Sequence, residues 1–290
     1  MRKWFHMGAF LLALVLATLG ASTGLTAALL FPVHESGGKT PADYDVAYQT
    51  LTFQTPTGAV LKGWFLSNPA AHGRTAVGLH GISANKAIFL DRAMPLYRLG
   101  FNVLMLDLRR HGDSTGDMTT YGYLESRDVV AAIDQLVRRP DVDPRGVVVM
   151  GWSMGGATAL QTLPYSKVRA VISDSAFSDL AAIMAFRGSQ WHVPSWPFQT
   201  LCDWEVSLVA PFQVTDVCPL RCLAASRKPV LLIHGGRDSS VPFSQGLQLS
   251  RAGDPAESFW AVPDAGHCLA EPLHPTEYQQ HLAAFLQQLN

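Results

Sequence analysis

The chain has 290 residues, of which 48% are hydrophobic and 16% charged, with a formal net charge of −1. This length allows one large α/β domain or two small ones, and we expect one. The composition argues against an intrinsically disordered chain, and the lack of any long run of Lys or Arg argues against binding to nucleic acid.

Residues 1–35 have the composition of a membrane-targeting segment. Arg2 and Lys3 precede an uncharged stretch over 7–31. About 20 apolar residues are needed to span a bilayer, whereas the apolar core of a cleaved signal has about 7–15. We therefore expect an uncleaved anchor, with residues 36–290 outside the cytoplasm because the basic end stays inside. Two alternatives stay open: cleavage within 21–24, which would give a secreted or periplasmic protein, and a helix buried in the fold.

The strands predicted after the anchor change in character along the chain. The segments YQTLTFQT and VLKGWFL alternate around a turn at Pro56 and Gly58, which predicts an antiparallel start. Short apolar runs, typical of parallel strands covered on both faces, then occur at 75–79, 101–106, 147–150, 170–172 and 230–233.

Helices are predicted between and after these strands. Apolar residues recur at spacings of three and four over 123–138, and again from Pro275 onward. Strands that alternate with helices predict a mostly parallel, doubly wound sheet, whose ligands bind at the carboxyl ends of the strands.

A serine stands between glycines where one of these strands ends. GWSMGG follows the apolar run VVVM and opens a predicted helix whose start is crowded with small residues. A bare G-x-S-x-G is weak evidence, but between a strand and a helix it predicts a nucleophile elbow. Gly151 and Gly155 allow the sharp turn and close packing of helix on strand. We predict that Ser153 is a nucleophile, because a purely structural turn would not need serine there.

Residues 176–227 interrupt the alternation of strands and helices. No clear strand appears there, and aromatic residues crowd among prolines. We predict an inserted helical cap over the strand ends, with Trp191 and Trp196 contacting substrate together with Trp152 beside the serine. A peripheral helical hairpin with its own small aromatic core is the alternative.

The four cysteines are Cys202, Cys218, Cys222 and Cys268. Outside the cytoplasm thiols tend to pair, and a disulfide from Cys202 to Cys218 or Cys222, which share one irregular region, is one interpretation. Free buried thiols are the other. A zinc site is disfavoured because CPLRC has no nearby second pair of suitable spacing.

An activated serine needs a base and a third group that holds the base. HGGRDSSVP places Asp238 after the strand at 230–233, and DAGH places His267 after the apolar segment FWAVP. Both residues follow Ser153 in the order acid, histidine, and each lies at a strand end. We therefore predict a triad of Ser153, Asp238 and His267.

Other acids and histidines compete for these roles. Asp264 could form a turn, and Asp107 could bond the neighbouring backbone. His80 and His234 each precede a glycine just after a strand, where histidine more often braces a loop. We rank Asp238 well above Asp107 as the acid.

Acyl transfer also needs donors for the oxyanion, usually backbone N–H groups from the residue after the nucleophile and from the loop after the third strand. These would be Met154 and, in LHGISAN, Ile82, with Ser83 as a possible substitute. Gly81 gives this loop the freedom to point its donors inward.

With these residues in place, the chain from about residue 41 to its end resembles the α/β-hydrolase superfamily, and within it the membrane-anchored serine hydrolases that are serine-aminopeptidase-like or esterase/lipase-like. The likeness rests on TFQTPTGAVLKGWFL, LHGISAN, DLRRHGDS, GWSMGG, HGGRDSSVP and DAGH, in that order. It implies the α/β-hydrolase fold and a catalytic type, not a substrate. Two features depart from the family: Arg110 stands where glycine is common, and the cap matches no member.

The predicted activity is hydrolysis of carboxylic esters, with a small-molecule ester or a lipid-like acyl substrate. Ser153 would attack the acyl carbon, His267 would move the proton, Asp238 would orient His267, and Ile82 and Met154 would bind the oxyanion. This mechanism requires no metal or organic cofactor.

Two other functions stay open at the level of sequence. A peptidase or amidase could use the same triad, with Asp203 or Glu205 in the cap holding a substrate amino terminus. A membrane-tethered binding protein could keep the fold without turnover.

Overall fold

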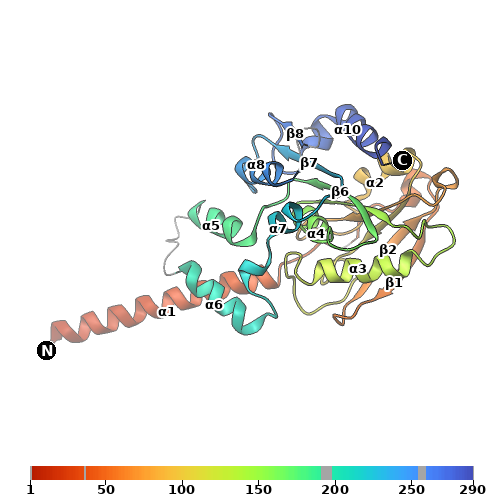
Figure 1. Ribbon diagram of the computed structural model, residues 1–290. Helices are drawn as coiled ribbons and strands as arrows, with labels where there is room; N and C mark the ends of the chain where they lie inside the picture. Colours follow the sequence, from red (N-terminus) through yellow and green to blue (C-terminus); the bar gives the residue numbers. More distant parts are fainter. Residues whose placement is uncertain (1, 36, 191–197, 254–258, 290) are drawn as a thin grey trace.

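The computed structural model describes residues 2–35, 37–190, 198–253 and 259–289 (Figure 1). Its centre is one eight-stranded sheet with the order β1-β2-β4-β3-β5-β6-β7-β8. β1 pairs antiparallel with β2 and β2 with β4, and all other pairs are parallel. This confirms the predicted sheet, mostly parallel with antiparallel N-terminal strands. The strands are β1 (Gln49–Gln54), β2 (Val60–Leu66), β3 (Thr75–Leu79), β4 (Asn102–Leu106), β5 (Val147–Trp152), β6 (Val168–Asp174), β7 (Val230–Gly235) and β8 (Phe259–Val262).

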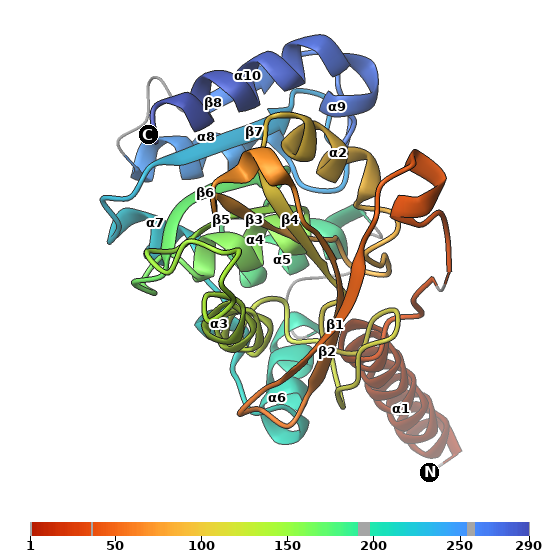
Figure 2. The ribbon, with the colours of Figure 1, turned by 90° about the vertical axis from the view of Figure 1, so that its right-hand side faces the viewer.

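Helices cover both faces of the sheet, which is why its central strands are continuous apolar runs. Every residue of β3 and β4 is buried. One face packs against α2 (Leu90–Arg98) and α10 (Pro275–Gln287) (Figure 2). The opposite face packs against α3 (Glu125–Leu136), α4 (Met154–Gln161), α7 (Pro219–Ala224) and α8 (Phe243–Ala252). Shorter helical turns are η1 (Pro41–Tyr44), η2 (Pro69–Ala71), η4 (Val214–Asp216) and α9 (Ala270–Leu273).

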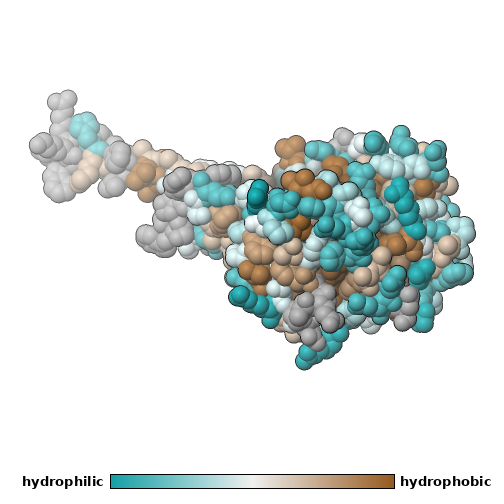
Figure 3. Space-filling view, turned by 90° about the horizontal axis from the view of Figure 1, so that it is seen from above, coloured by the Kyte–Doolittle hydropathy of each residue, from teal (hydrophilic) through white to brown (hydrophobic). Residues whose placement is uncertain are grey.

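Helix α1 (Arg2–Leu30) projects from the body as a narrow extension (Figures 1 and 3). Its segment Leu12–Leu30 has a mean hydropathy of 1.8 and is only 11% buried, and it is long and apolar enough to cross a membrane. That exposure does not fit a helix buried inside the fold. The last turns differ, because Ser22, Thr26 and Leu30 are buried against the domain. The chain therefore has one apolar N-terminal helix whose inner end belongs to the domain.

The described residues of the segment between β6 and β7 contain helices joined by loops, and no strand. α5 (Leu180–Gln190) and α6 (Thr200–Val209) lie on the side of the molecule where α1 leaves it, and α6 packs along α1 (Figure 1). α7 instead packs on α4 and α8 and belongs to the layer that covers the sheet. One helix of the predicted cap segment 176–227, α7, thus lies in the layer on a face of the sheet and not beside α1.

All four cysteines are free thiols in this structure. Cys202 is buried on α6, and its sulfur lies 3.6 Å from the Ser22 hydroxyl of α1. Burial raises the pKa of the Cys202 thiol. The disulfide interpretation is not the arrangement found.

Candidate active site

Ser153 lies in a sharp turn between β5 and α4. Its φ of 53° and ψ of −122° are strained for a residue with a side chain, and its N–H is held by the Asp174 carbonyl oxygen at 2.8 Å. Both flanking glycines are required. A Cβ on Gly151 would overlap the Gly155 carbonyl, and one on Gly155 would overlap the backbone of Leu79 in β3. The strain is maintained because strand, turn and helix pack backbone against backbone.

We expect Gly155→Ala to destabilise the protein by about 1–3 kcal/mol, since overpacking a tight contact forces backbone shifts of this cost. The added methyl would meet the carbonyl oxygens of Leu79 and His80, neither of which is a flexible side chain. Urea unfolding measures the change. Gly188→Ala in α5 is the matched control, because nothing lies within 4 Å of a Cβ there and alanine favours helix. Equal stability of the two variants would contradict the packing argument.

The loops after β7 and β8 bring an acid and a histidine to the serine. His267 Nδ1 lies 2.7 Å from Asp238 Oδ2, and His267 Nε2 lies 2.9 Å from Ser153 Oγ. Asp238 Oδ1 accepts hydrogen bonds of 2.8 Å from the N–H groups of Ser240 and Val241. The three residues predicted from sequence thus form one hydrogen-bonded row, and in this arrangement Nδ1–H faces the carboxylate while Nε2 accepts from the hydroxyl.

Each of the competing histidines, His80 and His234, lies within hydrogen-bond distance of loop backbone atoms. His80 Nδ1 lies 2.7 Å from the Gly81 carbonyl oxygen, and its Nε2 accepts from the Leu108 N–H at 3.0 Å. His234 Nε2 lies 3.0 Å from the Val241 carbonyl oxygen. His80 therefore joins the loop after β3 to the loop after β4, and His234 braces the loop that carries Asp238.

The competing carboxylates, Asp107 and Asp264, each pair with another side chain. Asp107 accepts from the Lys86 N–H at 2.7 Å and forms a 2.6 Å ion pair with the Lys86 ammonium. Asp264 pairs with His274 at 2.9 Å on the surface. Neither carboxylate contacts His267, which supports Asp238 as the acid.

His80 also makes the fold sensitive to acid. Burial, reinforced by the charges of His111 and Lys86, lowers the pKa of His80 to about 3. In the unfolded chain the histidine has its ordinary pKa of 6.5, so it binds a proton there that it does not bind in the folded chain. The free energy of unfolding is therefore unaffected by His80 above about pH 6.5. It falls as the pH drops from there toward 3, by about 1.4 kcal/mol per pH unit for one proton.

We expect His80→Gln to reduce the pH dependence of unfolding between pH 6 and pH 4 by about one proton. Urea unfolding at several pH values measures this slope, independently of any constant loss of stability from the substitution. An unchanged slope would show that His80 is not the buried group responsible.

The loop after β3 supplies the candidate oxyanion donors. The Ser83 N–H is already bonded to His111 Nε2 at 3.1 Å, so Ser83 is not available as the substitute donor. A Cβ on Gly81 would lie 3.3 Å from the Ser153 Cβ, which places this loop directly against the serine. Met154 opens α4, where an N–H has no partner within the helix. The N–H groups of Ile82 and Met154 remain the two candidates.

Comparisons with known proteins identify the family and the fold. Residues 76–278 match the Alpha/beta hydrolase family. The chain belongs to this family. It is similar to the uncharacterized protein YqkD of Bacillus subtilis, with 27% identity over 241 residues that cover 80% of this chain and 77% of that protein.

Two solved structures show the fold of this α/β-hydrolase. The esterase Pf2001 of Pyrococcus furiosus matches with a TM-score of 0.73 and 24% identity, over 89% of this chain and 99% of that one. The acylaminoacyl peptidase of Pyrococcus horikoshii matches with a TM-score of 0.62 and 16% identity, over 83% of this chain and 41% of that one. Both likenesses establish the α/β-hydrolase fold predicted from the sequence motifs.

Of the three tryptophans predicted to contact substrate, the structure describes only Trp152. Trp191 and Trp196 lie outside the described residues. Trp152 packs with the layer of α2 and α10, and its ring lies 4.6 Å from the Arg92 guanidinium. Side chains alternate along a strand, so Trp152 shares its face with Met150 and points away from the face that carries α4. The prediction that Trp152 contacts substrate is not supported by this placement.

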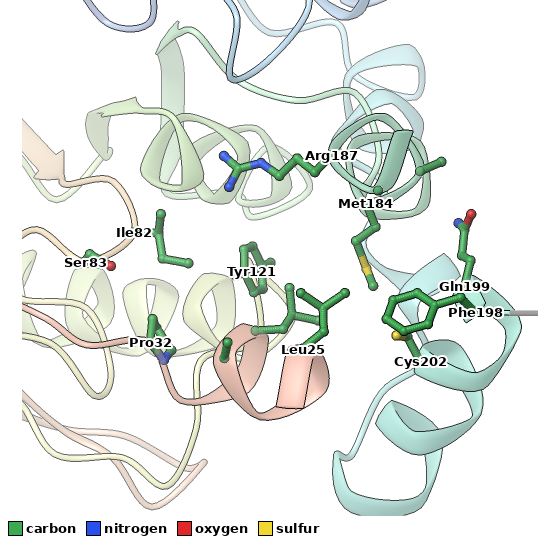
Figure 4. A pocket seen from close by; sticks show the side chains of 14 residues that line it. Leu25, Pro32, Ile82, Ser83, Tyr121, Met184, Arg187, Phe198, Gln199 and Cys202 are labelled. Atoms are coloured by element: carbon green, nitrogen blue, oxygen red, sulfur yellow. The ribbon is translucent and has the colours of Figure 1, made fainter. Parts of the chain in front are cut away.

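A cavity of about 280 Å³ opens beside the loop after β3 in this hydrolase (Figure 4). Ile82 and Tyr121 lie at one side, Met184 of α5 and Phe198 before α6 at another, and Leu25 of α1 closes a third. Sequence reasoning named Ile82 as an oxyanion donor, but it predicted none of these five residues as the wall of a pocket. They come from five separate parts of the chain, and the apolar composition of α1 indicates only a membrane segment.

Proposed function

We propose that this α/β-hydrolase cleaves carboxylic esters through an acyl-enzyme, as a serine hydrolase of the membrane-anchored, esterase/lipase-like kind. The observation that carries the proposal is the hydrogen-bonded row of Asp238, His267 and Ser153, with both links shorter than 3 Å. The strained turn beneath Ser153 also supports a reactive role, because a strained backbone persists only where the surrounding structure holds it.

The chemistry follows from the row. As Ser153 Oγ forms a bond to the acyl carbon, its proton passes to His267 Nε2, and Asp238 stabilises the resulting imidazolium. The N–H groups of Ile82 and Met154 hold the developing oxyanion. His267 then protonates the leaving alcohol oxygen as the acyl C–O bond breaks. Water attacks the acyl-enzyme with His267 as base, and the proton returns to Ser153 Oγ when the carboxylic acid leaves.

A fluorophosphonate probe tests whether Ser153 is activated. We expect covalent labelling of the folded wild-type protein and none of Ser153→Ala. Ser250→Ala is the matched control, because this serine lies on α8 with its hydroxyl bonded to the Leu247 carbonyl oxygen at 3.0 Å. A folded wild-type protein that remains unlabelled would favour the non-catalytic binding protein.

The same triad would serve a peptidase, but Asp203 and Glu205, the acids predicted to hold a substrate amino terminus, do not favour that role. Glu205 accepts hydrogen bonds from Thr23 and Thr26 of α1 at 2.9 and 2.8 Å. Burial raises the pKa of the Asp203 carboxyl, which weakens it as a partner for a substrate ammonium. Parallel assays with acyl esters and aminoacyl amides separate the two activities, and faster turnover of the amides would reverse the assignment.

We also propose that α1 is an uncleaved anchor and that the domain formed by residues 36–290 lies outside the cytoplasm. The exposed apolar segment Leu12–Leu30 and the basic residues Arg2 and Lys3 support this orientation. Membrane fractionation followed by protease treatment of intact cells tests it. Recovery of the full-length chain in the soluble cytosol would refute the anchor.

A further inference from the structure

We propose that α1 is more than a tether: its inner end forms a wall of the acyl-binding pocket, and the substrate is a long-chain acyl ester taken directly from the membrane. This inference rests on the proposed ester hydrolysis and names its substrate class.

The pocket has the position and lining that an acyl chain requires. Its wall near the serine is Ile82, which follows Gly81 in the loop lying against Ser153. From there the cavity runs between Leu25 of α1 and Met184 of α5 (Figure 4). An ester carbonyl at Ser153 would therefore direct its acyl chain past Ile82 into an apolar space bounded by α1.

Specific contacts hold the inner end of α1 in this position. Its last residue, Leu30, is fully buried, and the Leu30 carbonyl oxygen accepts from the Thr119 N–H at 2.9 Å. Thr23 and Thr26 both donate to the Glu205 carboxylate of α6. A helix that served only to attach the domain would not need polar contacts with the segment that covers the pocket.

The position where the sequence departs from its family also contacts this end of α1. Arg110 has a φ of 58°, a conformation that favours glycine, which explains why glycine is common there. Its guanidinium lies 5.1 Å from the ring of Phe31, the residue directly after α1. The arginine accepts an unfavourable backbone conformation while its side chain covers the end of the anchor helix.

The exposed apolar surface around the pocket fits a lipid bilayer. Leu12 and Leu16 of α1 are 60% and 59% exposed, and Trp204 and Leu208 of α6 are 55% and 62% exposed. Because α6 packs along α1, its exposed apolar side chains lie beside the segment able to span a membrane (Figure 1). A tryptophan there suits the membrane–water interface. The bilayer that holds α1 would thus meet α6 and the pocket between them.

The test compares a short and a long ester on the full-length protein in phosphatidylcholine vesicles. Leu25→Trp fills the pocket from α1, and Met184→Trp fills it from α5. Both side chains are partly exposed, so a larger ring can be accommodated at either position. If one variant misfolds, the other still tests the inference. Leu16→Trp, on the exposed outer part of α1, is the matched control.

We expect both pocket variants to lower kcat/KM for p-nitrophenyl palmitate at least about tenfold, while turnover of p-nitrophenyl acetate stays within about twofold of wild type. The control should leave both substrates unchanged. Equal effects on the two esters, or none on palmitate, would overturn the inference while the proposed function stands, because acetate turnover and probe labelling persist. Failure of the proposed function looks different: the wild-type protein would hydrolyse neither ester and would not be labelled.

Discussion

Replacement of Ser153 by alanine is expected to lower kcat for p-nitrophenyl acetate on the order of 10⁶-fold, the scale seen when a serine hydrolase loses its nucleophile. Without Oγ no acyl-enzyme forms. What remains is direct attack by water on a substrate held by the N–H donors of Ile82 and Met154, and such residual catalysis is far slower.

The serine, histidine and aspartate are expected to act as one unit, so their effects should not add. Ser153→Ala combined with His267→Ala should be no slower than Ser153→Ala alone, because His267 has no hydroxyl left to deprotonate. Urea unfolding of each variant, compared with wild type, shows whether the fold is retained. A further large loss in the double variant would mean that His267 acts independently of Ser153.

Asp238→Asn is expected to lower kcat about 10⁴-fold with little change in fold. The reason lies in the fixed orientation of this side chain. Asp238 Oδ1 already accepts from two backbone N–H groups, those of Ser240 and Val241. An asparagine would keep its carbonyl oxygen there and turn its NH₂ group toward His267 Nδ1. The histidine would then carry its proton on Nε2, where it could no longer accept the proton of Ser153.

The matched control for Asp238→Asn is Asp264→Asn. Asp264 also pairs with a histidine, His274, but at the surface and away from the serine. Its turnover should stay within about twofold of wild type. Comparable losses in the two variants, or a loss of less than tenfold in Asp238→Asn, would contradict the role assigned to Asp238.

The architecture and the three polar residues of the site were predictable from the sequence for a common reason. Parallel strands buried on both faces appear as short apolar runs, and their carboxyl ends meet at one edge of the sheet. Ser153, Asp238 and His267 each follow such a run, so they could be placed together although up to 114 positions separate them.

Features that depend on which face a side chain takes were not predictable in the same way. Trp152 precedes Ser153 and was expected near substrate, but alternation along β5 turns it toward Arg92 on the other face. Ser83 and Ile82 are neighbours in one loop, and only the hydrogen bond from Ser83 to His111 distinguishes them as oxyanion donors. Nothing in the short sequence of α7 indicates that it packs on α4.

The sheet, the positions of Ser153, Asp238 and His267 at strand ends, and the apolar N-terminal segment follow from the sequence alone, because each depends on local patterns of hydrophobicity, glycine and spacing. The surroundings of the serine, in contrast, depend on how distant segments pack. The pocket wall of Leu25, Tyr121 and Met184 comes from distant segments, and α1 joins it through the contacts of Thr23 and Thr26 with Glu205. Such contacts between segments far apart in the chain leave no periodic trace in the sequence, since they depend on how the finished helices pack.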